Sequence, residues 1–324
     1  MWLYLVAVLA GLFLLRRWHR ERQTVPGLSE KYVLITGCDS GFGNLLARQL
    51  EARGLRVLAA CLTETGAARL RAAASPRLQT VLLDVTSSRS IAAATAWVRE
   101  CVGDRGLWGL VNNAGIAIPT APNEWLTKDD FVKVLDVNLV GLIEVTLSLL
   151  PLVRQARGRV VNVASVMGRL SFFGGGYCIS KFGVEAFSDS LRIEMRDFGV
   201  KVSVIEPGYF KTLISNAENL ESNYLSIWEK LPEETRESYG ENYLKESLVM
   251  VRKMQKRCSS NLTLVTDCME HALTSRFPRT RYSAGWDAKL LYLPLSYLPS
   301  ALTDVVCTWS YPKPAQKASG RDAA

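Results

Sequence analysis

The chain has 324 residues, of which 48% are hydrophobic and 22% are charged, a composition that excludes global disorder and allows one large α/β domain or two small ones. Its formal net charge of +8 is compatible with an anionic membrane, an anionic ligand or nucleic acid, and we expect no nucleic acid because no long basic run lies beyond the N-terminus. Seven scattered cysteines without a Cys-x-x-Cys pair and only two histidines predict reduced thiols and no metal site.

The N-terminus begins with the uncharged apolar run MWLYLVAVLAGLFLL at 1–15, followed by RRWHRER at 16–22. As a helix the run is roughly 22 Å long, short of a ~30 Å hydrocarbon core, but arginine snorkelling or local thinning covers the deficit. We expect 1–22 to be a membrane anchor. A signal peptide is the main alternative, although the charges follow the run and no clear cleavage site is present; a core helix would show a polar stripe. The basic flank predicts a cytosolic domain.

From residue 31 onward, short apolar runs alternate with helical stretches. The runs lie at 31–36, 56–62, 78–85, 107–113, 159–165 and 200–208, with a last edge strand expected at 280–285. Helical spacing covers 42–53, 90–101, 128–155 and 177–198. This alternation predicts right-handed βαβ crossovers and hence an α/β fold at 30–288: a Rossmann-type, doubly wound parallel sheet of about seven strands with helices on both faces.

Residues 213–260 are charged and rich in tyrosine and show no strand pattern. They predict a helical insertion after the sixth strand. Open α/β sheets bind ligands at the carboxyl ends of their strands, so we interpret the insertion as a lid over an apolar substrate. A surface excursion without a role is the alternative.

A second apolar stretch occupies 289–311. Pro294, Pro299 and Asp304 argue against a single spanning helix. The stretch either rests on a membrane or is buried in the core. We assign 289–324 to an apolar membrane-associated segment that ends in a loose polar tail from residue 312.

The first predicted strand leads into the glycine-rich sequence TGCDSGFG at 36–43. Glycines let backbone N–H groups approach a pyrophosphate, and the following helix offers its positive N-terminus to the anion. A plain glycine-rich turn is the alternative, because the spacing differs from the commonest dinucleotide fingerprint. The position between a strand and a helix favours a dinucleotide site. Its expected residues are Thr36, Gly37, Ser40, Gly41, Phe42 and Gly43.

The second predicted strand ends at Ala60-Cys61-Leu62-Thr63. In many such folds an acid here binds the adenosine ribose, or an arginine accommodates a 2′-phosphate. The strand end offers neither, and we expect Glu64 to begin the next helix. This position therefore does not separate NAD from NADP.

Further motifs stand in later strands and helices. These are Asn113-Ala114-Gly115 after the fourth strand, Asn138 in the long helix, Ser165 after the fifth strand, Tyr177 and Lys181 at a helix start, and Pro207-Gly208 after the sixth strand. A Tyr-x-x-x-Lys pair alone recurs by chance, but the ordered set on matching elements does not. With the loop at 36–43, the set resembles the short-chain dehydrogenase/reductase family over about residues 30–285. Segments such as GLWGLVNNAG and HALTSRFPRTRYSAGWDAKL look like its microsomal retinol and hydroxysteroid dehydrogenases over nearly the whole chain.

The residue chemistry agrees with that resemblance. Alcohol oxidation needs a base, and free tyrosine, with a pKa near 10, is a poor base at pH 7. Lys181 lies one helical turn after Tyr177, so we expect its charge, together with nearby NAD⁺, to lower the Tyr177 pKa. Ser165 would orient the substrate oxygen. The alternatives are an ordinary helix-start aromatic, a turn-capping serine and a buried asparagine that bonds backbone.

The resemblance implies a membrane-bound oxidoreductase of the endoplasmic reticulum, with a cytosolic domain and membrane lipid as a partner. It implies hydride transfer between retinol or a 3α/17β-hydroxysteroid and NAD(H), without excluding NADP(H) or a homodimer. By the same resemblance, Asn138 holds a water that links Lys181 to solvent, and Asp84 contacts adenine unless it caps the next turn. A reductase that uses NADPH and a non-catalytic dinucleotide-binding membrane scaffold are the alternative functions.

The substrate pocket is expected to be shaped by 116–127, 166–176 and 209–250. Gly174–Gly176 put little bulk beside Tyr177, so we expect room there for a large alcohol. Replacing Gly175 with leucine would then harm bulky substrates more than small ones.

Overall fold

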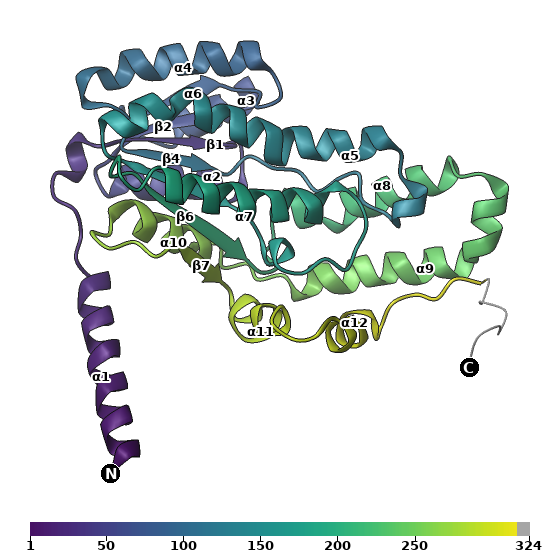
Figure 1. Cartoon of the computed structure of the whole chain (residues 1–324). Helices are drawn as coiled ribbons and strands as arrows, with labels where there is room; N and C mark the ends of the chain where they lie inside the picture. Colours follow the sequence, from purple (N-terminus) through teal and green to yellow (C-terminus); the bar gives the residue numbers. More distant parts are fainter. Residues whose placement is uncertain (316–324) are drawn as a thin grey trace.

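The computed structural model describes residues 1–315, so the predicted polar tail lies outside the described residues from 316 onward. Seven parallel strands form one sheet in the order β3-β2-β1-β4-β5-β6-β7 (Figure 1). The strands are β1 (Tyr32–Thr36), β2 (Arg56–Cys61), β3 (Leu78–Leu82), β4 (Gly109–Asn112), β5 (Arg159–Val163), β6 (Lys201–Pro207) and β7 (Arg281–Ala284). The predicted doubly wound sheet is confirmed, and the order reverses between β1 and β4, where such folds bind ligands.

Helices cover both faces of the sheet. They are α2 (Gly41–Ala52), α3 (Glu64–Ala72), α4 (Ser88–Val102), α5 (Lys128–Leu135), α6 (Gly141–Gln155), α7 (Gly176–Glu194) and α10 (Thr263–Thr274). Short 3₁₀ turns occupy Leu28–Glu30, Gly103–Arg105, Asn123–Trp125, Val166–Gly168 and Leu213–Ser215. As expected, Glu64 begins the helix that follows β2.

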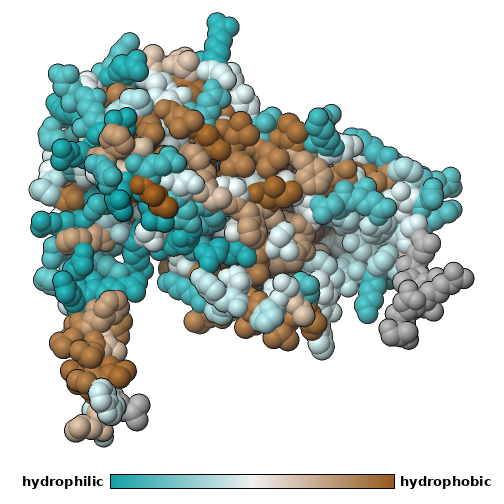
Figure 2. All heavy atoms as spheres, in the orientation of Figure 1, coloured by the Kyte–Doolittle hydropathy of each residue, from teal (hydrophilic) through white to brown (hydrophobic). Residues whose placement is uncertain are grey.

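The helix α1 (Trp2–Glu21) projects away from the sheet domain (Figure 1). Its 20 residues make a helix about 30 Å long, close to the thickness of a bilayer's hydrocarbon core. Apolar side chains such as Leu5, Leu9 and Leu12 lie exposed, and Figure 2 shows a hydrophobic column that stands out from the polar surface of the adjoining body.

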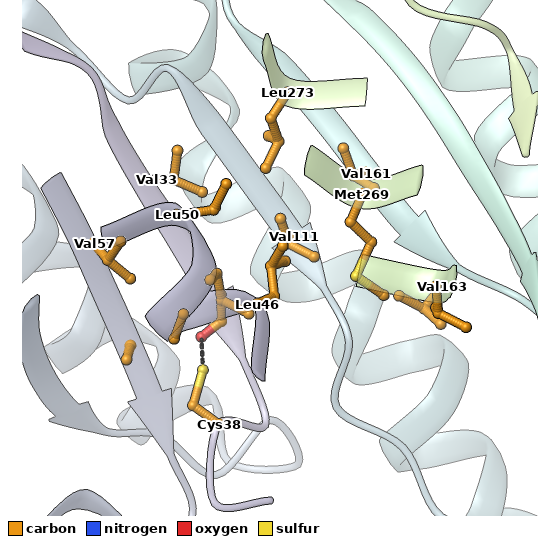
Figure 3. Packing of buried hydrophobic residues seen from close by; sticks show 14 of the residues in the cluster. Val33, Cys38, Leu46, Leu50, Val57, Val111, Val161, Val163, Met269 and Leu273 are labelled. Atoms are coloured by element: carbon orange, nitrogen blue, oxygen red, sulfur yellow. Dashed lines mark hydrogen bonds between the residues drawn. The ribbon is translucent and has the colours of Figure 1, made fainter. Parts of the chain in front are cut away.

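Alternation along the strands builds two cores. Val33 and Ile35 of β1 face α2 and α10, while Tyr32 and Leu34 face α4, α6 and α7. Figure 3 shows the first core, in which Leu46 and Leu50 of α2 and Met269 of α10 pack over the strands. Because the strands are buried on both faces, they appear in the sequence as continuous apolar runs.

The predicted helix at 128–155 is interrupted by a π-helical turn at Asp136–Val140, between α5 and α6. By length and composition alone, the helix at 128–155 could cross a membrane. It is instead part of the domain, because Val145 and Leu149 of α6 pack in the second core. The π turn contains Asn138, whose side chain is fully buried.

After β6 the chain forms α8 (Ala217–Glu229) and α9 (Glu233–Arg257), which confirms the helical character of the predicted insertion. Gly240, at φ 77°, kinks α9. Trp125, in the loop after β4, meets the rings of Tyr224, Trp228 and Tyr239 at centroid distances of 5.2, 5.1 and 5.0 Å. These aromatic contacts hold the insertion against the body.

The C-terminal apolar stretch is broken, as its prolines predict, into a π turn (Ala288–Tyr292), α11 (Leu293–Leu295) and α12 (Ser300–Thr308). Pro299 is the N-cap of α12, a position compatible with its missing N–H. In Figure 1 the segment runs below the sheet and α9.

Candidate active site

A cavity of about 1530 Å³ lies at the carboxyl ends of the central strands. Most of the residues predicted from the sequence line it: Gly37, Ser40, Gly41, Phe42, Asn113, Ala114, Gly115, Ser165, Tyr177, Lys181, Pro207 and Gly208. Thr36, Gly43, Asp84 and Asn138 are not among the lining residues. The structure therefore brings most of the set to one cavity and gives four of its members other contacts.

The loop after β1 is closely packed against the loop after β4. Gly37 has φ 69°, and a Cβ atom there would lie 2.9 Å from the Ala114 Cα. The Thr36 hydroxyl accepts hydrogen bonds from the backbone N–H groups of Asn113 and Ala114, both at 3.0 Å. Thr36 and the glycines thus shape this end of the cavity by holding two loops together.

The N-terminus of α2 is suited to an anion. Thr63, Ser87 and Thr127 cap α3, α4 and α5 through their side chains, but in the described chain no side-chain capping hydrogen bond is made by Ser40 at α2. The first-turn N–H groups of α2 consequently keep their capacity to donate, next to loop residues that line the cavity. These features fit the pyrophosphate of a dinucleotide.

A carboxylate does stand at the end of β2, and sequence reasoning missed it. It belongs to Asp39 of the glycine loop, whose Oδ2 accepts from Leu62 N at 2.8 Å and whose Oδ1 accepts from Thr63 N at 3.0 Å. Because β1 and β2 pair in parallel, the loop after one strand reaches the end of the other. In the sequence, only the expected pairing of the first two strands could have indicated that Asp39 reaches the end of β2.

Asp84 caps a turn, which was the alternative offered for it. Its Oδ1 accepts from the Thr86 backbone N–H at 2.9 Å and from the Thr86 hydroxyl at 2.7 Å. The carboxylate is engaged locally, and the predicted adenine contact stays a prediction.

Tyr177 and Lys181 stand at the start of α7, where Lys181 is buried and Tyr177 is partly buried. Lys181 Nζ lies 5.6 Å from the centroid of the Tyr177 ring and donates to the Val163 carbonyl at 2.8 Å. Burial raises the pKa of Tyr177 to about 12, opposed by hydrogen bonding with Ser165. Burial likewise lowers the pKa of Lys181 to about 8, opposed by the negative charge of Glu185. Desolvation dominates the Tyr177 pKa in the protein without cofactor, and the expectation that Lys181 together with NAD⁺ lowers this pKa stays a prediction.

Ser165 follows β5 and is 7% exposed. Its hydroxyl oxygen accepts from Met167 N at 3.1 Å, which caps the short turn Val166–Gly168. The turn-capping alternative thus applies to Ser165, and the same side chain also lines the cavity with Tyr177. One backbone bond leaves the hydroxyl proton available to a ligand.

Asn138 bonds to backbone from behind the cavity. Its Oδ1 accepts from Ile116 N and its Nδ2 donates to Ile116 O, both at 2.8 Å, and Nδ2 also donates to Ser180 Oγ at 3.1 Å. A Cβ on Gly115 would lie 3.2 Å from Asn138 Oδ1 and 3.8 Å from Lys181 Nζ. Asn138 therefore fixes the loop beside Lys181, while its water-holding role stays a prediction.

The glycines before Tyr177 do not leave open space, which corrects the sequence interpretation. Gly175 has φ 95°, and a Cβ there would lie 3.0 Å from Pro119 O and 3.4 Å from a Leu126 methyl group. A Cβ on Gly174 would overlap Ala121 O, and one on Gly176 would lie 2.9 Å from Val134 Cβ. The three glycines serve close packing against the loop after β4 and against α5.

The cavity has a wall that sequence reasoning missed. Residues from 116–127, 166–176 and 209–250 contribute as predicted, but Tyr292, Leu295 and Tyr311 of the C-terminal stretch also line the cavity. The Tyr292 ring stacks on Phe172 with centroids 6.1 Å apart, and the Tyr311 hydroxyl donates to the Phe172 carbonyl. The prolines and aromatic residues of 289–311 indicated a broken apolar segment but not where it packs.

A network of ion pairs contains two buried carboxylates, Glu185 and Glu206. Arg281 pairs with Glu185 at 3.0 Å and with Asp189 at 2.7 Å, and Arg169 pairs with Glu206 at 3.2 Å. Burial and the nearby Glu206 raise the pKa of Glu185 to about 7, against the effect of Arg281. The network joins α7, β6 and β7 below the catalytic residues proposed from sequence.

Comparison with known proteins decides the family. A model of the short chain dehydrogenase family matches residues 31–223, more than half of the chain. The chain belongs to the short-chain dehydrogenase family. The enzyme is 65% identical to human retinol dehydrogenase 16, and the match covers 98% of this chain and 99% of that protein. It is 61% identical, with the same coverage, to human 17-beta-hydroxysteroid dehydrogenase type 6.

The fold, too, is that of a short-chain dehydrogenase. A short chain dehydrogenase/reductase from Burkholderia phymatum, solved in complex with NAD, superposes with a TM-score of 0.67 at 23% identity, over 89% of this chain and 98% of that one. The enzyme is thus an oxidoreductase of the short-chain dehydrogenase family. The matched region contains the glycine loop, Ser165, Tyr177, Lys181 and Gly208.

Proposed function

We propose that the enzyme oxidises an apolar alcohol, retinol or a 3α/17β-hydroxysteroid, to retinaldehyde or a ketosteroid with NAD⁺. The observation that carries the proposal is the placement of Ser165, Tyr177 and Lys181 on one large cavity, whose lining also includes aromatic and aliphatic residues from α9 and the C-terminal stretch. Relatives named for retinol and for a 17β-hydroxysteroid support both substrate classes.

In this proposal Tyr177 is the base that removes the proton from the substrate hydroxyl. Ser165 bonds the substrate oxygen and holds it near the phenol. Lys181, fixed by the Val163 carbonyl, receives the proton from Tyr177 or compensates the phenolate charge. A bound NAD⁺ would supply the hydride acceptor and a positive charge that favours the phenolate. The glycine loop and the α2 N-terminus would hold the pyrophosphate, while Asn113–Gly115 and Pro207-Gly208 would border the nicotinamide half.

We propose NAD rather than NADP as the cofactor because of Asp39. Its Oδ2 accepts one hydrogen bond and retains capacity for a ribose hydroxyl. A 2′-phosphate at the end of β2 would instead meet this negative charge. Arg71, which lies nearby, is paired with Glu64 and donates to Thr80 at 2.7 Å, so its charge is already engaged.

We also propose that α1 anchors the enzyme in the endoplasmic reticulum membrane with the domain in the cytosol, and that α8 and α9 form the lid. The exposed apolar surface of α1 and the basic residues at its C-terminal end support the anchor and its orientation. Tyr224, Tyr243 and Met250, which line the cavity, support the lid.

The test is a substrate panel on membranes that contain the full chain. Retinol, a 3α-hydroxysteroid and a 17β-hydroxysteroid are each assayed with NAD⁺ and NADP⁺, and the carbonyl products with NADH and NADPH. Oxidation of at least one alcohol with NAD⁺ is expected. Cofactor binding without turnover of any of them would favour a scaffold, and faster carbonyl reduction with NADPH would favour a reductase.

A further inference from the structure

The C-terminal stretch from Trp286 to Pro312 has two different faces. On the inside, Tyr292, Leu295 and Tyr311 line the cavity. On the outside it presents an outer apolar face, defined here as Leu290, Tyr297, Leu298, Leu302, Val305 and Trp309, all exposed. Figure 2 shows hydrophobic atoms along the lower edge of the body, where Figure 1 places α11 and α12. A contiguous exposed apolar surface of this kind marks an interaction site.

The direction of α1 relative to this face is fixed by polar contacts. Glu21, at the end of α1, accepts from Arg17 Nε at 2.9 Å and from Arg279 Nε at 2.8 Å. The backbone continues into a bridge between Thr24 and Ser275. In Figure 1, α1 leaves the body on the side that also holds α11 and α12. A bilayer entered by α1 would therefore lie on the side of the outer apolar face.

The mouth of the cavity lies at the same edge. Residues that both line the cavity and are exposed define its rim, and the large apolar members are Leu213, Ile214, Val249, Trp286, Leu291 and Val306. The charged side chains of α9 that line the cavity and are exposed are three basic ones, Lys245, Lys253 and Arg257, and one acidic one, Glu246. An apolar rim with a basic border is complementary to the acyl chains and anionic headgroups of a membrane surface.

We propose that the outer apolar face docks on the bilayer that α1 enters, and that the cavity opens there, so that the apolar alcohol passes from lipid to Tyr177 without crossing water. The substrate part of this inference rests on the proposed function, whereas the docking part does not. The continuity of the face with the anchor side of the molecule and with the basic rim favours lipid over a second copy of the chain.

Docking is tested by fluorescence on the full chain in vesicles of phosphatidylcholine and phosphatidylserine, with and without brominated acyl chains. The part of the quenching that belongs to Trp309 is the difference between the wild type and Trp309→Phe, since Trp2 and Trp18 of α1 contribute equally to both. Quenching of Trp309 is expected. Equal quenching in the two proteins would overturn docking, even if the enzyme oxidises alcohols well.

Substrate delivery is tested with Leu302→Glu/Trp309→Glu in the same vesicles. Neither residue lines the cavity. The KM for vesicle-dissolved substrate should rise by about tenfold or more, because two charged groups oppose burial of the face, while kcat/KM for a small water-soluble secondary alcohol stays within about twofold. Leu147→Glu, an exposed apolar position on α6, is the matched control and should change neither value.

Three results would overturn the delivery proposal. One is an unchanged KM for the vesicle-dissolved substrate, and another is an equal loss for both substrates. The third is a lower oligomeric mass of the double variant than of the wild type, together with equal quenching in the wild type and Trp309→Phe, which would assign the face to a second copy of the chain.

Discussion

Lys181 lies over the ring of Tyr177, with its Nζ 5.6 Å from the ring centroid, and its hydrogen bond goes to the Val163 carbonyl. Desolvation disfavours charge on either group, so the Tyr177 pKa is raised to about 12 and the Lys181 pKa is lowered to about 8. Such a pair titrates jointly, and its first proton leaves near the lower of the two values.

The rate of alcohol oxidation should therefore rise with pH up to about 8 and level off above it, because the pair accepts the substrate proton only after losing one of its own. In Lys181→Arg the side chain at position 181 stays charged at every accessible pH. The inflection of the pH–rate profile should therefore move to higher pH, and the oxidation rate at pH 7 should fall by about tenfold or more. Single-turnover rates of cofactor reduction, measured across the pH range, give both the inflection and the rate at pH 7. An inflection that stays near 8 in Lys181→Arg would contradict the assignment.

Asp39 should set the cofactor preference. Asp39→Asn removes the negative charge at the end of β2 while keeping the size of the side chain, so the Kd ratio of NADPH to NADH should fall by about tenfold, or ~1.4 kcal/mol. Titration of the full chain with each reduced cofactor, followed by ligand fluorescence, gives the ratio without turnover. Asp104→Asn, in a distant 3₁₀ turn, is the control, and an unchanged ratio in Asp39→Asn would refute the role.

Glu185 should make stability fall with rising pH. Its folded pKa of about 7 lies above its reference value of 4.5, so the folded chain binds more protons than the unfolded chain between these values. The free energy of unfolding accordingly decreases from about pH 4.5 to 7, by up to about 3 kcal/mol. Denaturant unfolding should show this slope in the wild type and a flatter one in Glu185→Gln; parallel slopes would be inconsistent with the shifted carboxyl.

Gly175 should matter for folding more than for substrate size. Its φ is 95°, and a Cβ atom at this position would lie 3.0 Å from Pro119 O, so Gly175→Ala should cost about 1–3 kcal/mol of unfolding free energy. Loss of activity should be similar for bulky and small alcohols. Gly11→Ala, at a position with open surroundings, serves as the control. A selective loss for bulky substrates alone would restore the interpretation that these glycines make room for the substrate.

The sequence predicts local features well and tertiary ones poorly. Strands such as Tyr32–Thr36 are visible because burial on both faces makes them continuously apolar, and the glycine loop shows by its position between a strand and a helix. The location of Asp39 depends on the pairing of β1 with β2, and the wall formed by Tyr292 and Tyr311 depends on how the chain folds back after β7. Neither relationship has a periodicity or spacing that a single sequence displays.

The central claim is that Tyr177 performs the proton transfer, whereas cofactor binding at the same site does not depend on the Tyr177 hydroxyl. The most direct measurement is a comparison of Tyr177→Phe with the wild type for both NADH affinity and kcat of alcohol oxidation, in the same membranes. We expect kcat to fall by about 10² to 10⁴, with the NADH Kd changed by less than about threefold. Turnover of Tyr177→Phe close to that of the wild type would contradict the account.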